Sequence, residues 1–212
     1  MNTTEIFPGA FHAQAFLSRA EQRDLTDYVN VLAAGPIGFY RPQVRGGGYM
    51  RCEMLCLGRH WNAKTYSYEM RRSDADGSVV LPVPTDFVMV AARAAAEVGF
   101  VLDPDICIIN RYSQDGKMGL HQDKDEHRST LDAGVPIVSL SLGSTARFVV
   151  GGSRRREQTK AIALQSGDAF VMGGPSRLRY HGITRILKGT GPLELGIPGR
   201  LSLTFRQYQL EK

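Results

Sequence analysis

The chain has 212 residues, a formal net charge of +5 and a pI of about 9.2. This length fits one domain with a substantial core, and the apolar and charged fractions are ordinary for a soluble globular protein. No apolar run is long and uncharged enough to span a bilayer, so we expect no membrane-spanning helix.

The N-terminal residues and the cysteines indicate a cytoplasmic protein. The segment MNTTEIFPGAFHAQ lacks the basic and apolar regions of a secretory signal. The three cysteines, Cys52, Cys56 and Cys107, have neither the spacing of a disulfide framework nor that of a zinc site. We therefore expect a reducing compartment and buried or inert thiols.

The first predicted element is an amphipathic helix. Ser18 followed by Glu21 is the pattern of a capping box, so the helix should begin there and continue to about Ala34. Gly35-Pro36 ends it, because proline cannot continue a helix. Residues 1–35 are therefore expected to form an N-terminal helical segment.

Residues 36–84 have a different composition. Glycines, aromatic residues and basic residues interleave there with little helical periodicity. Such a pattern favours short strands or hairpins joined by flexible turns. A second helix, rich in alanine, is expected from about Asp86 to Val98.

After Pro104 the sequence has the pattern of a β protein. Short and often alternating apolar segments are separated by turns rich in glycine, serine and aspartate. Closely spaced short strands after a helical start are typical of a sandwich or jelly roll. The predicted strands cover residues 106–112, 135–142, 146–150, 161–165, 169–172, 179–182 and 201–208.

The basic residues gather in three clusters: Arg71-Arg72, Arg154-Arg155-Arg156 and the pair Arg177 and Arg179. A patch built from such clusters can bind a polyanion, because phosphate contacts dominate nucleic-acid affinity. Each cluster can equally be a solvated loop. Charge alone therefore leaves nucleic-acid binding open.

His121 and Asp123 form an H-x-D pair that can place two ligands on one metal ion, since side chains at i and i+2 of an extended strand share a face. His181 follows 58 residues later (181 − 123) and offers the third ligand. Two histidines and one carboxylate form the facial triad of non-haem Fe(II) oxygenases. Taken alone, His181 is more often a hydrogen-bonded core histidine.

The last predicted strand carries two arginines on one face. Arg200 and Arg206 bracket the segment RLSLTFR, whose opposite face is apolar. Two inward-facing guanidinium groups need anions, and a small dicarboxylate would supply them. The other interpretation is an edge strand with two surface arginines, and periodicity does not choose between the two. Asn110 and Tyr112 form a second i, i+2 pair that can line the same pocket or simply end a strand.

Four blocks of the sequence together resemble a known family. They are NRYSQDGKMGLHQDKDE, PIVSLSLG, SGDAFVMGGPSRLRYHGI and RLSLTFR. In this order and with little gapping they resemble the bacterial AlkB family, Fe(II)- and 2-oxoglutarate-dependent nucleic-acid dealkylating dioxygenases. The resemblance is close over roughly the last half of the chain and looser over the front half.

The resemblance implies a mainly β fold, a double-stranded β-helix (jelly roll) with N-terminal helices and a nucleotide-recognition lid of loops and hairpins. The lid would occupy residues 36–84, and the dioxygenase core residues 85–212 as a single structural unit.

The resemblance also implies the roles of individual residues. Three match iron ligands, which also makes them the catalytic set: His121, Asp123 and His181. Five match or replace residues that hold 2-oxoglutarate: Asn110, Tyr112, Arg200, Ser202 and Arg206, with Ser202 where the family commonly has asparagine. Five match contacts to the flipped base or its strand: Trp61, Tyr66, Tyr68, Asp125 and Arg155.

The implied activity is oxidative dealkylation of bases such as 1-methyladenine and 3-methylcytosine, which is direct-reversal DNA repair. Fe(II) would be the metal cofactor, 2-oxoglutarate and O2 would be consumed, and formaldehyde, succinate and CO2 released. The partner would be alkylated single- or double-stranded DNA, with RNA tolerated, and nothing demands more than a monomer. Other hypotheses are a hydroxylase of the same cofactor class that acts on an RNA modification or a protein side chain, and a jelly roll that binds metal without catalysis.

Two residues of the substrate set have a physical reason for their role. Asp125 would favour bases methylated at N1 of adenine or N3 of cytosine, because these carry a positive charge. Its other interpretation is an ordinary acidic turn with Glu126 and Lys124. Trp61 is the only tryptophan and lies in the polar segment RHWNAK, which favours base stacking over core packing.

Overall fold

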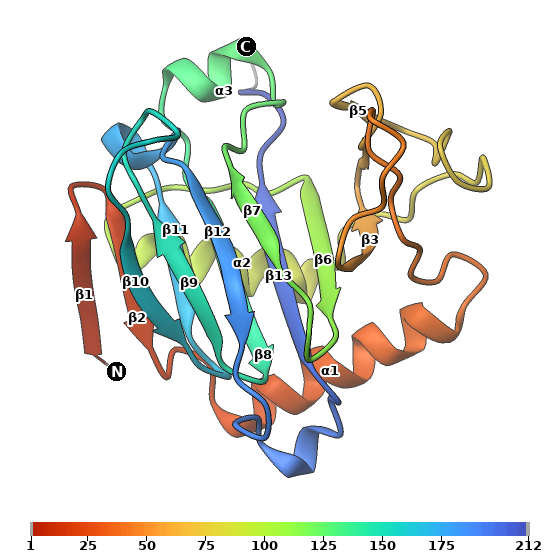
Figure 1. Ribbon diagram of the computed structural model, residues 1–212, viewed down its shortest axis with the longest axis horizontal. Helices are drawn as coiled ribbons and strands as arrows, with labels where there is room; N and C mark the ends of the chain where they lie inside the picture. The colour runs from red at the N-terminus through yellow and green to blue at the C-terminus, as the bar shows by residue number, and fades with distance from the viewer. Residues whose placement is uncertain (1, 211–212) are drawn as a thin grey trace.

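Two antiparallel sheets form the body of the computed structural model, which describes residues 2–210 (Figure 1). The large sheet contains, in spatial order, β1 (Asn2–Phe7), β2 (Ala10–Gln14), β11 (Ala169–Met172), β8 (Ile137–Gly143), β13 (Arg200–Arg206), β6 (Ile106–Tyr112) and β3 (Glu53–Leu57). The small sheet contains β10 (Lys160–Leu164), β9 (Ala146–Val150), β12 (His181–Ile186) and β7 (Met118–His121). Sheet-on-sheet packing of this kind confirms the predicted jelly roll.

Helices cover the outer face of the large sheet. Helix α1 (Arg19–Ala34) and helix α2 (Thr85–Ala96) contribute Leu25, Val29 and Phe87 to an apolar core that they share with β13 and β8. A short helix, α3 (Arg128–Asp132), and two 3₁₀ turns, η1 (Gly174–Ser176) and η2 (Leu193–Leu195), lie in the connections. One face of the large sheet is thus closed by helices, and the other faces the small sheet.

The capping box at the start of α1 is formed as predicted. Ser18 Oγ accepts a hydrogen bond from the backbone N–H of Glu21 at 3.2 Å, and Glu21 Oε2 accepts one from the backbone N–H of Ser18 at 2.8 Å. These bonds satisfy two donors that a helix start otherwise leaves unpaired. Helix α2 begins at Thr85 and ends at Ala96, within two residues of its predicted bounds.

Most predicted strands are present. Strands β6, β9 and β11 match their predicted ranges, and β8, β10 and β13 differ by one or two residues at their ends. Strand β12 begins at His181 and extends to Ile186, beyond the predicted end at residue 182. Thr184 and Arg185 are polar and exposed, so the sequence pattern did not indicate that the strand continues through them. Both belong to the strand that pairs with β9.

The expectation of a helical segment over residues 1–35 is wrong for its first part. Residues 2–14 form the hairpin β1–β2, and β2 also pairs with β11 in the large sheet. A turn at Pro8-Gly9, with Gly9 at φ +80°, connects the two strands. That Pro-Gly pair was a local turn signal, but the decisive partner, β11, lies about 160 residues away in the chain.

The predicted lid segment is attached to the large sheet at one edge. Strand β3 pairs with β6, so part of residues 36–84 belongs to the sheet itself. Beyond it, β4 (His60–Asn62) and β5 (Ser67–Glu69) form a separate two-stranded hairpin at the right of Figure 1. We refer to residues 36–84 as the lid.

The three cysteines are buried and form no disulfide. Burial raises the pKa of Cys52 and that of Cys56 to about 12, so neither thiol ionises near neutral pH. The three thiols are buried, as predicted. Across residues 2–210, we found no helix with the length and apolar character needed to cross a membrane.

Candidate active site

Three predicted ligands converge at one end of the small sheet. His121 is the last residue of β7 and His181 the first of β12, and the two are register partners across that strand pair. His121 Nε2 lies 3.5 Å from Asp123 Oδ1, and His181 Nε2 lies 3.6 Å from Asp123 Oδ2. One ligand atom from each residue lies within 4.8 Å of the other two, an arrangement that can hold one metal ion.

The imidazole rings are oriented by backbone carbonyls. His121 Nδ1 lies 2.9 Å from the carbonyl oxygen of Gly119, and His181 Nδ1 lies 3.0 Å from that of Arg179. A carbonyl only accepts, so each Nδ1 carries the proton and each Nε2 keeps its lone pair. Both lone pairs are therefore directed toward Asp123, as a metal site requires.

Charge states in the triad also suit a cation. Burial lowers the pKa of His121 to about 4, with a further contribution from His181, so the ring is neutral at pH 7. Burial alone would raise the pKa of Asp123, but Arg206 and the two histidines hold it well below its usual range. A neutral imidazole and an ionised carboxylate are the forms that bind metal ions.

The triad lies at one side of a cavity of about 60 Å³ between the two sheets. Four of the five residues predicted to hold 2-oxoglutarate line the same cavity: Asn110, Tyr112, Ser202 and Arg206. Ser202 is paired in register with Asn110, and Arg200 with Tyr112, across strands β13 and β6. The two interpretations of the arginine face of β13 are thereby resolved: it points into the space between the sheets.

Arg200 is fully buried, with 0% of its surface exposed. Its guanidinium donates to Ser141 Oγ at 2.7 Å and to the carbonyl oxygen of Leu164 at 3.2 Å. Its Nε has no hydrogen-bond partner, and within residues 2–210 no carboxylate lies within 4.0 Å of it. Burial lowers the pKa of Arg200 to about 10, which leaves it charged at pH 7 and in need of an anion.

Arg206 connects the triad to a buried ion-pair network. It donates from Nη2 to Asp123 Oδ2 at 2.7 Å, and its Nε lies 3.2 Å from Glu126 Oε1. Glu126 Oε2 in turn lies 3.0 Å from Arg177 Nη2. The Nη1 of Arg206 has no partner among the described residues, so one donor remains for a bound anion.

Glu126 and Arg177 were not predicted as site residues. Arg177 was grouped with Arg179 in a basic cluster on the surface, but its side chain is only 2% exposed and donates to the backbone of Asp123 and Val135. Arg72 of another cluster is buried as well. These arginines donate to carboxylates and backbone carbonyls of the protein itself, so they do not belong to a solvated patch.

Ser202 lines the cavity where the family commonly has asparagine. Its Oγ lies 2.9 Å from Ser139 Oγ, and both hydroxyls face the same space. A hydroxyl pair can donate one hydrogen bond into the cavity while keeping the other internal.

The aromatic residues of the lid approach the acidic segment that follows the triad. Trp61 Nε1 donates to Asp125 Oδ2 at 2.8 Å, and Tyr68 Oη donates to Glu126 Oε1 at 3.4 Å. Tyr66 packs edge-on against Trp61 and is 48% exposed. Burial raises the pKa of Asp125. Trp61 is half-buried against the cluster of Met54 and Cys56, so it combines packing with a hydrogen bond.

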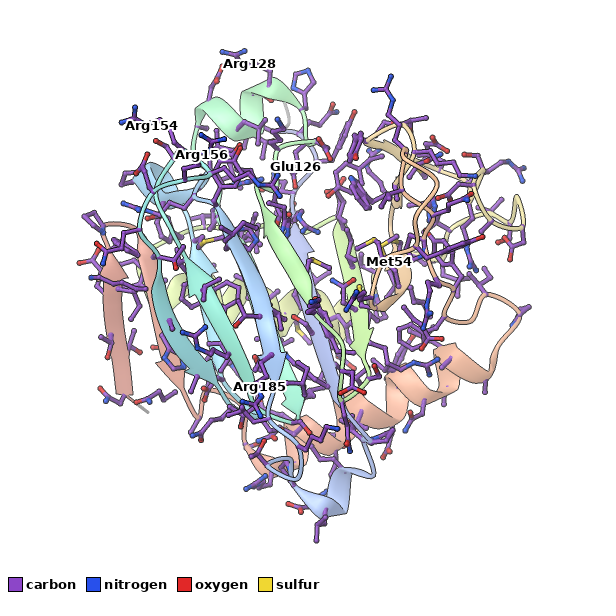
Figure 2. All side chains as sticks on the ribbon, in the orientation of Figure 1. Met54, Glu126, Arg128, Arg154, Arg156 and Arg185 are labelled. Atoms are coloured by element: carbon purple, nitrogen blue, oxygen red, sulfur yellow. The ribbon has the colours of Figure 1, made fainter. Side chains whose placement is uncertain are left out.

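The remaining predicted residue, Arg155, is exposed in the loop between β9 and β10. Its neighbours Arg154 and Arg156 lie with Arg128 at the same end of the molecule as Glu126, while Arg185 lies at the opposite end of the small sheet (Figure 2). The loop therefore borders the end that carries the triad, and Arg155 contacts none of the buried site residues.

Comparisons with known proteins agree with this geometry. The family model described as the 2OG-Fe(II) oxygenase superfamily matches residues 9–206. The alpha-ketoglutarate-dependent dioxygenase AlkB of Salmonella typhimurium is 38% identical over 206 residues, 95% of this chain and 91% of the relative. The DNA N(6)-methyladenine demethylase ALKBH1C of Arabidopsis thaliana is 37% identical over 97% of this chain and 50% of the relative.

Among solved structures, that of OsALKBH1 superimposes with a TM-score of 0.91 at 36% identity, covering 97% of this chain and 100% of the other. The chain spans about half the length of ALKBH1C and of two further Arabidopsis thaliana relatives. Fe(II) is the metal cofactor of this superfamily, and 2-oxoglutarate and O2 are its cosubstrates. The three donors fit the metal, and the buried, incompletely paired Arg200 fits a dicarboxylate. The family match, the coverage of AlkB and the triad together place this chain in the AlkB family of Fe(II)- and 2-oxoglutarate-dependent oxygenases.

Proposed function

We propose that this protein removes alkyl groups from the nitrogen atoms of nucleic-acid bases, such as 1-methyladenine and 3-methylcytosine in DNA. The observation that carries this proposal is that the triad borders an inter-sheet cavity lined by Asn110, Ser202 and Arg206, while lid aromatics bond to the acidic segment that follows the triad. The names of AlkB and ALKBH1-type relatives support the same class of reaction.

His121, Asp123 and His181 would hold the iron, with both Nε2 atoms and one carboxylate oxygen as ligands. Iron and 2-oxoglutarate, when bound, supply the oxidation of the N-alkyl carbon by O2, with succinate and CO2 as coproducts. Arg206 keeps Asp123 ionised and fixes one of its oxygens, so the other is directed to the metal.

Five residues would hold 2-oxoglutarate between the sheets. Arg200 binds the distal carboxylate, because its guanidinium is fully buried and its Nε has no hydrogen-bond partner. Arg206 Nη1 is placed for the end nearer the metal, beside Asp123. The polar groups of Asn110, Tyr112 and Ser202 line the cavity between these two ends.

Base recognition would involve the lid and the acidic segment. Trp61, Tyr66 and Tyr68 offer ring faces for stacking of an extruded base, which excludes water from the alkyl carbon. Asp125 keeps Oδ1 free while Oδ2 accepts from Trp61, so it can face a cationic base. Once a methyl carbon is hydroxylated, its C–N bond breaks and the ring nitrogen keeps the electron pair, while the hydroxyl group loses its proton to water and leaves as formaldehyde.

The proposal also covers the nucleic-acid partner, the oligomeric state and the cellular location of the protein. Its partner would be single- or double-stranded DNA, with RNA accepted as well, held in part by Arg155 on the β9–β10 loop. It would act as a monomer. We place it in the cytoplasm, since unbonded buried cysteines are typical of proteins from reducing compartments.

The test is reconstitution with Fe(II) and 2-oxoglutarate without oxygen, followed by addition of O2. Succinate and formaldehyde are then measured with oligonucleotides that contain 1-methyladenine, 3-methylcytosine or N6-methyladenine, the last because of the relatives' names. Formaldehyde that requires an alkylated oligonucleotide supports the proposal. Succinate without formaldehyde in every case would instead favour a hydroxylase with another substrate, such as an RNA modification or a protein side chain.

Replacing Asp125 with asparagine should lower kcat/KM for 1-methyladenine by about tenfold or more, since a hydrogen bond to a charged group contributes about 1.5–3 kcal/mol. The asparagine oxygen can still accept from Trp61, so the lid contact is kept. Activity on the neutral N6-methyladenine should change much less. Steady-state kinetics on matched oligonucleotides measure the ratio, and equal losses on both bases would contradict charge recognition.

Arg155→Ala should raise KM for the oligonucleotide several-fold and reduce the slope of log affinity against log salt by about 1, as for one lost phosphate contact. Affinity for 2-oxoglutarate should not change. Arg185→Ala is the matched control, because this exposed arginine lies at the other end of the small sheet. Fluorescence anisotropy at several salt concentrations gives the slopes; a larger effect on 2-oxoglutarate than on DNA would remove Arg155 from the substrate surface.

A further inference from the structure

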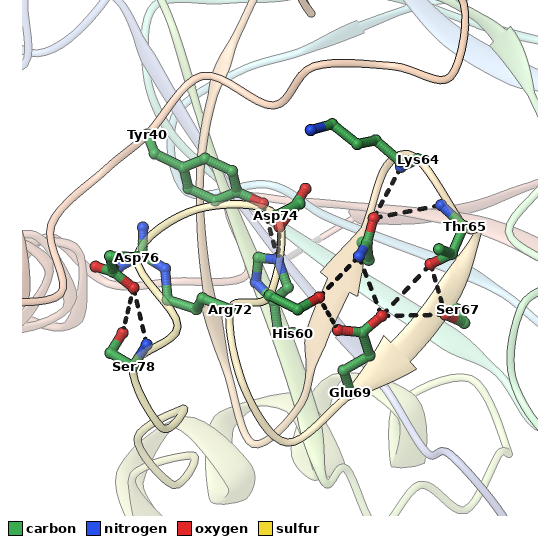
Figure 3. Close-up of polar contacts among 12 residues, drawn as sticks. Tyr40, His60, Lys64, Thr65, Ser67, Glu69, Arg72, Asp74, Asp76 and Ser78 are labelled. Atoms are coloured by element: carbon green, nitrogen blue, oxygen red, sulfur yellow. Dashed lines mark hydrogen bonds and ion pairs between the residues drawn. The ribbon is translucent and has the colours of Figure 1, made fainter.

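The lid has a polar core, in which His60 contacts Asp74 and Tyr40 (Figure 3). Strand β4 contains only His60, Trp61 and Asn62, so the two flanking side chains point to one face and Trp61 to the other. His60 and Asn62 are 0% and 4% exposed, whereas Trp61 is half-buried on the side of Asp125. Neither flanking residue lines the cavity between the sheets, so neither takes a direct part in the proposed reaction.

His60 is held by two groups from distant parts of the lid. Its Nε2 lies 2.5 Å from Asp74 Oδ1 and 3.1 Å from Tyr40 Oη. The side chains of His60 and Asp74 are 0% and 1% exposed, so water does not compete for this pair. Removal of either partner would leave the other buried and uncompensated, so this pair fixes the two lid segments relative to each other.

Tyr40 ties this pair to the body of the protein. Its backbone exchanges hydrogen bonds of 3.1 and 2.8 Å with Met54 of β3, the edge strand of the large sheet. The guanidinium of Arg72 lies 4.8 Å from the centre of the Tyr40 ring and covers it. Burial raises the pKa of Tyr40, so its hydroxyl remains a neutral hydrogen-bonding group.

Asn62, which follows Trp61 in β4, is held by a second set of hydrogen bonds. Its Nδ2 donates to Glu69 Oε1 and to Ser73 Oγ, both at 3.0 Å. Its Oδ1 accepts from the backbone N–H groups of Lys64 at 2.9 Å and Thr65 at 3.3 Å. One side chain therefore closes the β4–β5 turn and joins the hairpin to the loop that follows it.

We infer that His60 and Asn62 are positioning residues that fix Trp61 for base stacking, with Asp74 and Tyr40 as their anchors in the lid and the sheet. This inference rests on the proposed function for its substrate. The physical reason is preorganisation: a stacking ring that is already fixed loses little conformational entropy when the base binds. Apolar packing against Met54 and Cys56 supports one side of Trp61, and the buried hydrogen bonds of His60 and Asn62 hold the strand that carries it.

The single tryptophan makes the inference directly measurable, because all tryptophan emission comes from Trp61. In His60→Ala, emission of the free protein should shift to longer wavelength and acrylamide quenching should increase. With Fe(II) and 2-oxoglutarate, KM for a single-stranded oligonucleotide containing 1-methyladenine should rise about tenfold, the size expected when one buried hydrogen-bond partner is lost. Neither kcat at saturating oligonucleotide nor the affinity for 2-oxoglutarate should change comparably.

His60→Gln should restore emission and KM in large part, because its amide N–H can take the place of Nε2–H on Asp74. The matched control is His12→Ala, which removes another buried histidine–aspartate pair, His12 Nε2 to Asp168 Oδ2 at 2.8 Å. His12 lies on β2 and Asp168 directly precedes β11, toward the edge of the large sheet opposite β3, so loss of this pair should leave Trp61 emission and KM unchanged. If His60→Ala does not fold, Asp74→Asn is measured in its place.

The outcomes separate the inference from the proposed function. Unchanged emission and quenching in a folded His60→Ala or Asp74→Asn protein would overturn the inference, as would the same changes in His12→Ala. A red shift without a rise in KM would overturn the part that concerns base stacking. The fluorescence of the free protein needs no substrate, so a wild-type protein that fails to turn over any oligonucleotide would contradict the proposed function without touching this measurement.

Discussion

Asp123→Ala is expected to abolish turnover and to lower Fe(II) affinity by about a hundredfold or more, since even residues that only orient metal ligands contribute about 10–100-fold. It should also destabilise the fold. Arg206 donates to Asp123 Oδ2 at 2.7 Å, and these side chains are only 7% and 10% exposed. Removal of one partner of a buried ion pair typically costs about 3–5 kcal/mol.

Asp123→Asn separates these two effects. The asparagine oxygen still accepts from Arg206, so the melting temperature should fall less than in the alanine variant, while metal binding is lost because the ligand is no longer anionic. Titration with Fe(II) under nitrogen, thermal melting and succinate release measure the three quantities. His121→Ala and His181→Ala should lose turnover with the fold retained, and normal turnover in any of these variants would exclude the triad as the iron site.

Arg200→Met should weaken 2-oxoglutarate binding by about a hundredfold, because truncation of a buried charged partner typically costs about 2–5 kcal/mol. The ligand-free protein should lose little stability. Arg200 is fully buried and its Nε has no hydrogen-bond partner, so its desolvation is compensated only in part by Ser141 and the carbonyl of Leu164 until an anion binds. Arg200 is therefore expected to contribute to 2-oxoglutarate affinity but little to the stability of the ligand-free protein.

Thermal melting with and without 2-oxoglutarate shows both sides of this prediction. 2-Oxoglutarate should raise the melting temperature of the wild type, and the same concentration should raise that of Arg200→Met very little. Arg200→Lys should recover part of the gain, because an ammonium keeps the charge but not the two-pronged geometry. A full ligand-induced gain in Arg200→Met would show that the distal carboxylate is bound elsewhere.

Local sequence patterns predicted the elements whose reasons are local. The capping box at Ser18 and Glu21 requires only neighbouring groups, and α1 begins there. Strands β6, β9 and β11 are apolar runs bounded by turn residues, which makes their ends visible in the sequence. The hairpin β1–β2 was missed because its residues alternate weakly, and β2 becomes a strand through its pairing with β11.

For the site, the spacing of His121 and Asp123 predicted two ligands, because side chains two residues apart on an extended segment share a face. His181 was a candidate third ligand, and Arg200 and Arg206 candidate partners of a dicarboxylate, from the residues themselves; the resemblance to a family assigned these roles. No local pattern indicated Glu126 and Arg177, which are 51 residues apart (177 − 126) and meet only in the folded chain. Likewise, His60 and Asn62 look like ordinary polar loop residues in the sequence.

What the sequence by itself determined is the set of elements with a local cause, the donor types at the metal site and, by resemblance, the family. Tertiary structure alone decided which face of β13 is interior, since Arg200, Ser202 and Arg206 would be a solvated stripe without the small sheet packed over them. It also decided which arginines are buried counter-ions and which are exposed. Burial depends on the neighbours that the fold brings together, and the sequence of a single strand does not indicate which segments will pack against it.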